Sequence, residues 1–122
     1  MKASARILGA VLLPVVGLVS ACHSFHIETT VENRTGEAIQ LLEVDYPSAS
    51  FGADKVAAGA DFQYRIQVRG SGHLTVQYTG SNGRQVSQID GPELAERQEG
   101  RLEIVLLPAG KAEFHPQLSP MP

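Results

Sequence analysis

The stretch FQYRIQVRGSGHLTVQYT, residues 62–79, alternates apolar and polar side chains on either side of a short segment that contains two glycines. Its apolar positions are Phe62, Tyr64, Ile66, Val68, Leu74, Val76 and Tyr78. Alternation with a period of two is typical of a β-strand that buries one face. The stretch therefore predicts a β-hairpin that turns at Gly70-Ser71-Gly72 and buries one of its two faces.

The polar side chains of this predicted hairpin would share its exposed face. The candidate partner surface on that face consists of Arg65, Gln67, Arg69, Thr75 and Gln77. The simpler interpretation of the same residues is a solvated sheet face, because antiparallel sheets commonly expose one polar side.

Similar alternation continues on both sides of the hairpin. The further strands expected are Ile27–Val31, Ile39–Tyr46, Phe51–Val56, Val86–Ile89 and Leu102–Leu106. About seven strands at intervals of roughly 8–12 residues, without crossover helices, predict an all-β fold. We expect a small antiparallel β-sandwich over residues 26–108, followed by a disordered tail at residues 109–122, which hold three of the seven prolines.

Four short segments give local predictions. A change of phase at Leu41-Leu42 predicts a β-bulge. The turn Gly80-Ser81-Asn82-Gly83 contains Asn-Gly, which favours a type I′ turn. Glu93–Glu99 forms either a short helix or a loop, with the loop favoured. Val105-Leu106-Leu107 is either covered on both sides, which we favour, or an edge strand open to strand addition.

The first 22 residues have the pattern of an export signal. Lys2 and Arg6 come at the start, and the run from Ile7 to Val19 is uncharged. This run is shorter than the roughly 20 apolar residues that span a bilayer. It leads into Val19-Ser20-Ala21-Cys22, which resembles the lipobox of bacterial lipoproteins, with valine where leucine is commoner. Cys22 is the only cysteine in the chain.

This resemblance implies that the thiol of Cys22 receives a diacylglycerol. It also implies cleavage of a lipoprotein signal peptide, residues 1–21, and acylation of the new amino group. Residues 22–25 would form a short lipidated linker, and two or more acyl chains anchor a protein stably. The expected location is the bacterial cell envelope. His23 replaces the aspartate of inner-membrane retention signals, which favours the outer membrane, facing the periplasm, in a Gram-negative host.

The charge of the chain disfavours some partners. Loss of Lys2 and Arg6 with the signal peptide changes the formal net charge from −3 to −5. The mature chain has no basic block and no alternation of basic and aromatic residues, which argues against nucleic acid and against attraction to anionic lipid headgroups. The expected partners are therefore the membrane, through the acyl chains on Cys22, and an envelope protein.

No group of reactive residues predicts an enzyme, a cofactor or a metal site. The four histidines have no metal-binding spacing, and they are His23, His26, His73 and His115. The aspartates of the expected loops lack a calcium-loop pattern, and they are Asp45, Asp54, Asp61 and Asp90. No serine lies in a nucleophile elbow. Asn33-Arg34-Thr35 has the form of a glycosylation acceptor, but a bacterial host favours a turn residue there.

The strand pattern resembles the immunoglobulin-like or transthyretin-like sandwiches of small bacterial lipoproteins over residues 26–108. The chain departs from true immunoglobulin domains because it has no tryptophan and no pair of cysteines. The stretch DYPSASFG, residues 45–52, also resembles a segment of an uncharacterised lipoprotein family. These resemblances imply a fold class and an immunoglobulin-like architecture, and no activity.

The leading functional prediction is a lipid-anchored, non-catalytic binding or interaction module of the cell envelope. A carrier of a small hydrophobic ligand or of a metal is the alternative, although the strands hold enough large apolar residues to fill a core of this size. A hydrolase is the third hypothesis, and it requires a histidine, an acid and a nucleophile to meet in one cleft.

Overall fold

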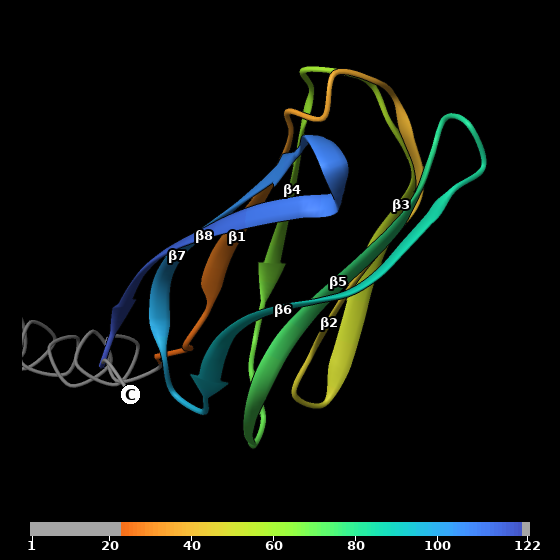
Figure 1. Cartoon of the computed structure of the whole chain (residues 1–122). Helices are drawn as coiled ribbons and strands as arrows, with labels where there is room; N and C mark the ends of the chain where they lie inside the picture. The colour runs from red at the N-terminus through yellow and green to blue at the C-terminus, as the bar shows by residue number, and fades with distance from the viewer. Residues whose placement is uncertain (1–22, 121–122) are drawn as a thin grey trace, which may run out of the picture.

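Eight β-strands form two four-stranded sheets in the computed structural model of the chain, which describes residues 23–120 (Figure 1). The strands are β1 (Ile27–Asn33), β2 (Ile39–Tyr46), β3 (Ala49–Val56), β4 (Asp61–Ile66), β5 (Ser71–Gly80), β6 (Gln85–Ala95), β7 (Glu99–Leu107) and β8 (Lys111–Ser119). A short 3-10 turn, Pro108–Gly110, joins β7 to β8. The all-β prediction is confirmed.

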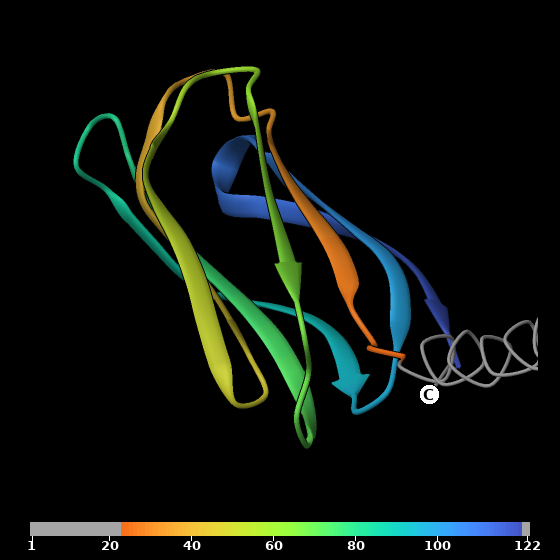
Figure 2. The same cartoon turned by 180° about the vertical axis from the view of Figure 1, so that it is seen from behind.

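The strand order is β4-β1-β7-β8 in the first sheet, which we call sheet I, and β3-β2-β5-β6 in the second, sheet II. The two sheets lie face to face (Figures 1 and 2). All neighbouring strands are antiparallel except β1 and β7, which run parallel with Ile27 opposite Gly100. The predicted antiparallel sandwich is therefore correct in class, with one parallel pair inside sheet I.

The core lies between the two sheets. Each strand contributes to it the apolar side chains of its inward face. The apolar side chains with no exposed surface are Ile27, Val31, Ile39, Val44, Leu74, Val76, Leu94, Ile104 and Leu106. Burying a side chain of this size stabilises the fold by about 1.5–3 kcal/mol relative to exposure. Period-two patterning thus decides which face of each strand points inward.

The predicted hairpin of residues 62–79 is not formed. β4 pairs with β1 in sheet I, whereas β5 pairs with β2 and β6 in sheet II. Residues 67–70 carry the chain from one sheet to the other, and Val68 is buried on the way. The alternation predicts which face of each strand is buried, and it is the same whichever of the two sheets contains the strand. It therefore does not predict which strands pair with one another.

The predicted β-bulge at Leu41-Leu42 is confirmed. Against β5, Gln40 pairs with Thr79 and Glu43 pairs with Gln77, so two leucines lie opposite the single residue between them. Leu42 is buried, whereas 64% of Leu41 is exposed. The extra residue therefore changes the phase of the strand and keeps both halves of β2 facing the core.

The turn at residues 80–83 joins β5 to β6 as a hairpin, as expected, but it is not a type I′ turn. The amide of Gly83 donates to the carbonyl of Gly80 at 3.0 Å, and that of Gly80 donates to the carbonyl of Arg84 at 2.8 Å. Gly83 alone carries the left-handed backbone of this turn, with φ of 81°. This is the pattern of a three-residue hairpin loop that ends in a glycine bulge.

The end of the chain is a strand where the sequence analysis expected a disordered tail. Lys111–Ser119 forms β8, which pairs with β7 along its whole length. Ala112, Phe114 and Leu118 face the core, so the segment has the period-two pattern that its prolines obscured. Pro116 is compatible with this strand because β8 is an edge strand, and proline is tolerated at the edges of sheets.

The other two local predictions concern the segment that leads into β7 and the end of β7 itself. Glu93–Glu99 contains the end of β6, a tight turn at residues 96–98 and the first residue of β7, so the favoured loop describes only its middle. Val105-Leu106-Leu107 lies in β7, which is internal to sheet I between β1 and β8. The edge-strand hypothesis is therefore wrong. Leu106 is buried, and its two neighbours are half-buried on the outer face.

β1 begins at the same end of the sandwich at which β8 ends (Figure 2). Three connections lie at this end, namely the β2–β3 turn, residues 67–70 and residues 96–98 (Figure 1). We call it the proximal end, because the first described residue, His23, lies there beside Glu99 at the start of β7. The opposite end, where β1 leads into β2, is the distal end.

Candidate interaction surfaces

The structure does not bring the five residues of the predicted partner surface together. Arg65 lies on β4, on the outer face of sheet I, where its Nε donates to Glu28 Oε1 at 2.7 Å. Gln67 and Arg69 are exposed in the connection between the sheets. Thr75 and Gln77 are half-buried on β5 of sheet II. The predicted surface therefore depended on a hairpin that does not exist.

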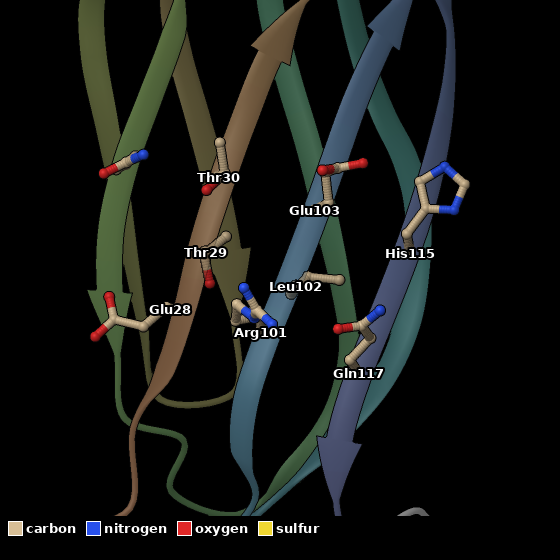
Figure 3. Close-up of a pocket in the computed structure, with 9 residues that line it drawn as sticks. Glu28, Thr29, Thr30, Arg101, Leu102, Glu103, His115 and Gln117 are labelled. Atoms are coloured by element: carbon tan, nitrogen blue, oxygen red, sulfur yellow. The ribbon is translucent and has the colours of Figure 1, made fainter.

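A hollow with a volume of about 560 Å³ lies on the outer face of sheet I (Figure 3). Its lining is Glu28, Thr29, Thr30, Gln63, Arg101, Leu102, Glu103, His115 and Gln117. In cross-strand register Arg101 lies between Glu28 and Gln117, and Glu103 lies between Thr30 and His115. Polar groups from four strands thus form a regular pattern on this face.

Charges on the outer face of sheet I are largely compensated. Beyond the Arg65–Glu28 pair, Arg34 Nη2 donates to Glu32 Oε1 at 2.7 Å. This hydrogen bond holds the pKa of the Glu32 carboxyl below its usual range. His115 Nε2 lies 3.5 Å from Glu113 Oε1. Because these pairs are solvent-exposed, each contributes little to folding stability.

The outer face of sheet II has a different charge pattern. Its acidic residues Glu43, Asp45 and Asp90 form no ion pair within residues 23–120. Asp45 and Asp90 both lie opposite Thr75, from the strands on its two sides. Burial, and then the neighbouring Glu43 carboxyl, raises the pKa of Asp45. Glu43, Asp45 and Asp90 are therefore gathered on this face without an ion pair, although Glu93 lies 3.8 Å from His73 and Lys55 of β3 lies opposite Gln40.

A second feature of sheet II is a hollow of about 310 Å³ over β2 and β3. It is lined by Leu41, Leu42, Glu43, Ser50, Phe51, Gly52, Ala53 and Asp54. Gly52 lies against the carbonyl of Leu42, so closely that a Cβ at residue 52 would collide with it. The bulge in β2 thus lies against Gly52, a residue of β3 that has no side chain. Sequence analysis predicted the bulge but did not single out Leu41 as an exposed residue.

A stacked aromatic group closes the side of the sandwich where β3 of sheet II meets β4 of sheet I. The rings of Phe51 and Tyr64 are 4.8 Å apart and nearly parallel, and those of Phe51 and Phe62 are 6.1 Å apart. Phe51 is buried, whereas 46% of Tyr64 is exposed. Sequence analysis assigned these rings to buried faces but did not predict that they meet across the two sheets.

The histidines are dispersed over the described part of the molecule. Their nearest carboxylates are Glu99 for His23 at 3.3 Å, Glu93 for His73 at 3.8 Å and Glu113 for His115 at 3.5 Å. His26 directly precedes β1. Within residues 23–120, no three histidine or acidic side chains are grouped to hold a metal ion.

Several serines and aspartates of the described chain lie on strands and turns. Ser48 lies in the β2–β3 turn and Ser81 in the β5–β6 turn. Asp54 and Asp61 are exposed on β3 and β4. No hydrogen bond joins a serine to a histidine in the described part of the chain. Here too, residues 23–120 offer no nucleophile held against a base.

Asn33 of the glycosylation-like sequence is fully buried at the distal end of β1. Its Nδ2 donates to the carbonyls of Glu37, Val56 and Ala57 at 2.8, 3.0 and 3.1 Å. Its Oδ1 accepts from the amide and the hydroxyl of Thr35. Asn33 is therefore the last residue of β1 rather than a turn residue, and its side-chain amide holds the β1–β2 connection.

The predicted lipid-attachment residue, Cys22, and the signal peptide lie outside the described residues. The first described residue, His23, follows Cys22 directly, and β1 begins four residues later. Among the residues described, no helix is long and apolar enough to cross a bilayer.

Comparison with known proteins supports the fold alone. No known protein family matches the chain, and no curated protein sequence matches it. One similar solved structure is described as the NMR structure of the protein from Eubacterium rectale. Its TM-score is 0.53 at 11% sequence identity, and the match covers 74% of this chain and 86% of that one. At this identity the similarity carries no function.

Proposed function

We propose that this protein is a lipid-anchored, non-catalytic interaction module of the bacterial cell envelope. The observation that carries the proposal is the lipobox-like Val19-Ser20-Ala21-Cys22 together with a folded sandwich that begins at Ile27. A diacylated or triacylated Cys22 would tether the domain by its proximal end. In a Gram-negative host, we place it on the periplasmic face of the outer membrane.

The short linker would limit the distance between the tethered domain and the bilayer. Residues 23–26 separate Cys22 from β1, and an extended chain spans at most about 3.5 Å per residue. The start of β1 would therefore lie within roughly 17 Å of the headgroups. The proximal connections would face the bilayer, while the distal end and the outer faces of both sheets would remain accessible to a protein partner.

We further propose that the sandwich is of the transthyretin-like rather than the immunoglobulin-like kind. The constant-type immunoglobulin order ABED places the first two strands side by side in one sheet. Here β1 and β2 lie in different sheets, and β1 lies between β4 and β7. This strand order supports the alternative that the sequence pattern left open.

Lipidation is tested by expressing the chain in a bacterial host with a radiolabelled fatty acid, beside the variant Cys22→Ser. We expect label on the parent protein, a mass loss that corresponds to residues 1–21, and neither change in the variant. The matched control is Ser24→Ala, which leaves the cysteine intact and should be labelled normally. Label on the Cys22→Ser chain contradicts the proposal.

The interaction role is tested separately by crosslinking in intact cells, followed by purification through a tag. We expect a discrete crosslinked envelope protein that survives stringent washing and is absent when the folded domain is replaced by an unrelated lipidated domain. Recovery of the same background proteins from both chains would count against an interaction module.

A further inference from the structure

Leu41 combines exposure with a strained backbone. It has φ of 53°, in the left-handed region, and 64% of it is exposed. A residue other than glycine is disfavoured in this region, and such strain gathers at functional sites. The core does not need this side chain, because Leu42 fills the inward position of the bulge. A bulge can re-aim a side chain, and here it directs a leucine into solvent.

The region around Leu41 has the structural features of a strand-addition site. The hollow of about 310 Å³ lies beside it, and the missing side chain of Gly52 leaves the backbone of β3 bare. β3 is an edge of sheet II, and no strand of the described chain pairs with its outer side. In strand addition, edge hydrogen bonds supply affinity and side-chain pockets supply specificity.

The charges around the hollow indicate which kind of partner would bind there. Lys55 of β3, opposite Gln40, is the one basic residue of β2 and β3, whereas Glu43 and Asp54 line the hollow and Asp45 lies two residues beyond Glu43. None of these three carboxylates forms an ion pair within residues 23–120. A second copy of the chain would bring the same acids against these, which is unfavourable. A cationic segment is complementary.

We propose that the hollow over β2 and β3 binds an extended, cationic segment of a partner protein. The segment adds to the free edge of β3 and places an apolar side chain against Leu41. This inference rests on the proposed interaction function and names its surface and the chemistry of its partner. The position suits such a role, because Leu41 lies near the distal end of β2, which the short linker keeps away from the bilayer.

The test uses the full chain in detergent micelles and a synthetic peptide, Lys-Val-Lys-Leu-Lys-Val-Lys. Amide NMR shifts are followed during titration at low and moderate salt. We expect the shifts to concentrate on residues 50–54 and 40–45, and the affinity to fall as salt rises. The acidic analogue, Glu-Val-Glu-Leu-Glu-Val-Glu, should not bind. Shifts located elsewhere, no binding, or equal binding of the acidic peptide would overturn the proposal.

Leu41→Gly is the decisive variant, because glycine accepts the left-handed backbone and the fold should be retained. We expect its affinity for the basic peptide to fall about tenfold, the effect of losing an anchor residue. The matched control is Gln88→Gly, which replaces another exposed left-handed residue on β6 and should bind normally. Equal affinity of parent and Leu41→Gly would refute the role of Leu41.

Self-association is measured by dilution without peptide. Concentration-dependent shifts at residues 40–45 would identify a second copy as the occupant and overturn the assignment to a cationic partner. The fate of the proposed function is separate: if the cellular crosslink persists in the Leu41→Gly chain, the interaction module stands and only this surface is wrong.

Discussion

The side chain of Asn33 donates a hydrogen bond from Nδ2 to the carbonyl of Val56 at 3.0 Å. This bond joins the distal end of β1 in sheet I to the end of β3 in sheet II. The same amide group also donates to Glu37 and Ala57. The Glu37 and Ala57 carbonyls also accept from Thr35 Oγ1 and from the Ala60 amide, so Asn33 joins a hydrogen-bond network that links the two sheets.

Asn33→Asp is expected to destabilise the fold strongly. The substitution keeps Oδ1, which Thr35 needs, but replaces the donor with a charged oxygen that faces three carbonyls. Placing an unpaired, buried charge against these carbonyl oxygens should lower the free energy of unfolding by about 3 kcal/mol or more. Chemical denaturation measures this loss.

Asn82→Asp is the matched control for this substitution. The Oδ1 of Asn82 accepts from the amide of Arg84 at 2.9 Å in an exposed turn, and aspartate retains that acceptor. Its stability should stay within about 0.5 kcal/mol of the parent. Similar losses in the two variants would refute the special role of Asn33.

Sequence patterning predicted which faces of the strands are buried, and it predicted the bulge, because both are local. The two leucines of Leu41-Leu42 cannot point the same way in one extended strand, so the sequence alone predicts the change of phase. The sheet to which each strand belongs could not be predicted in this way. Whether β4 pairs with β5 or with β1 depends on contacts between residues far apart in the sequence, such as Thr29 with Tyr64.

The same limit explains the candidate surfaces. Arg65 and Thr75 were grouped because they share one phase of the alternation, yet they belong to different sheets. The exposed Leu41 was missed because its exposure follows from the direction in which the bulge turns the backbone. The prolines of residues 109–122 predicted a tail because their compatibility with an edge strand depends on where that strand lies.

Leu118→Ala tests whether β8 is part of the folded unit. Leu118 is buried at the end of β8, opposite Gly100. Truncating a buried leucine should lower the free energy of unfolding by about 2–4 kcal/mol. Gln117→Ala, at the exposed neighbouring position, should change it by less than about 0.5 kcal/mol. An unchanged unfolding midpoint for Leu118→Ala would indicate that this segment contributes nothing to the fold.

Gly52→Ala tests the close approach of β3 to the bulge. A Cβ at residue 52 would collide with the carbonyl oxygen of Leu42, which is backbone and cannot rotate away. We expect a loss of more than about 2 kcal/mol in the free energy of unfolding. Ser50→Ala, on the same strand, serves as the control and should be nearly neutral. Equal stability of parent and Gly52→Ala would show that β2 and β3 can separate locally without loss.

Asp45→Asn tests the uncompensated charge of sheet II through its pH dependence. Burial, and then Glu43, raises the pKa of Asp45 in the folded chain. The folded state therefore keeps the proton of Asp45 to higher pH than the unfolded chain does, so ionisation of this carboxyl opposes folding. The free energy of unfolding should fall as pH rises from the ordinary pKa of aspartate, about 3.9, through the raised value.

Removing this ionisable group should flatten the stability profile in that window. We expect Asp45→Asn to be more stable than the parent at pH 7, and the difference to disappear below the ordinary pKa of aspartate, where both side chains are neutral. Thermal unfolding at a series of pH values measures the effect. Asp54→Asn, at an exposed position of β3, controls for general charge reduction. Because Asp45 lies beside the hollow proposed to bind a cationic segment, the basic peptide should also bind Asp45→Asn more weakly while the domain itself is stabilised. A variant that loses both stability and peptide affinity would instead mean that the Asp45 carboxylate supports the fold.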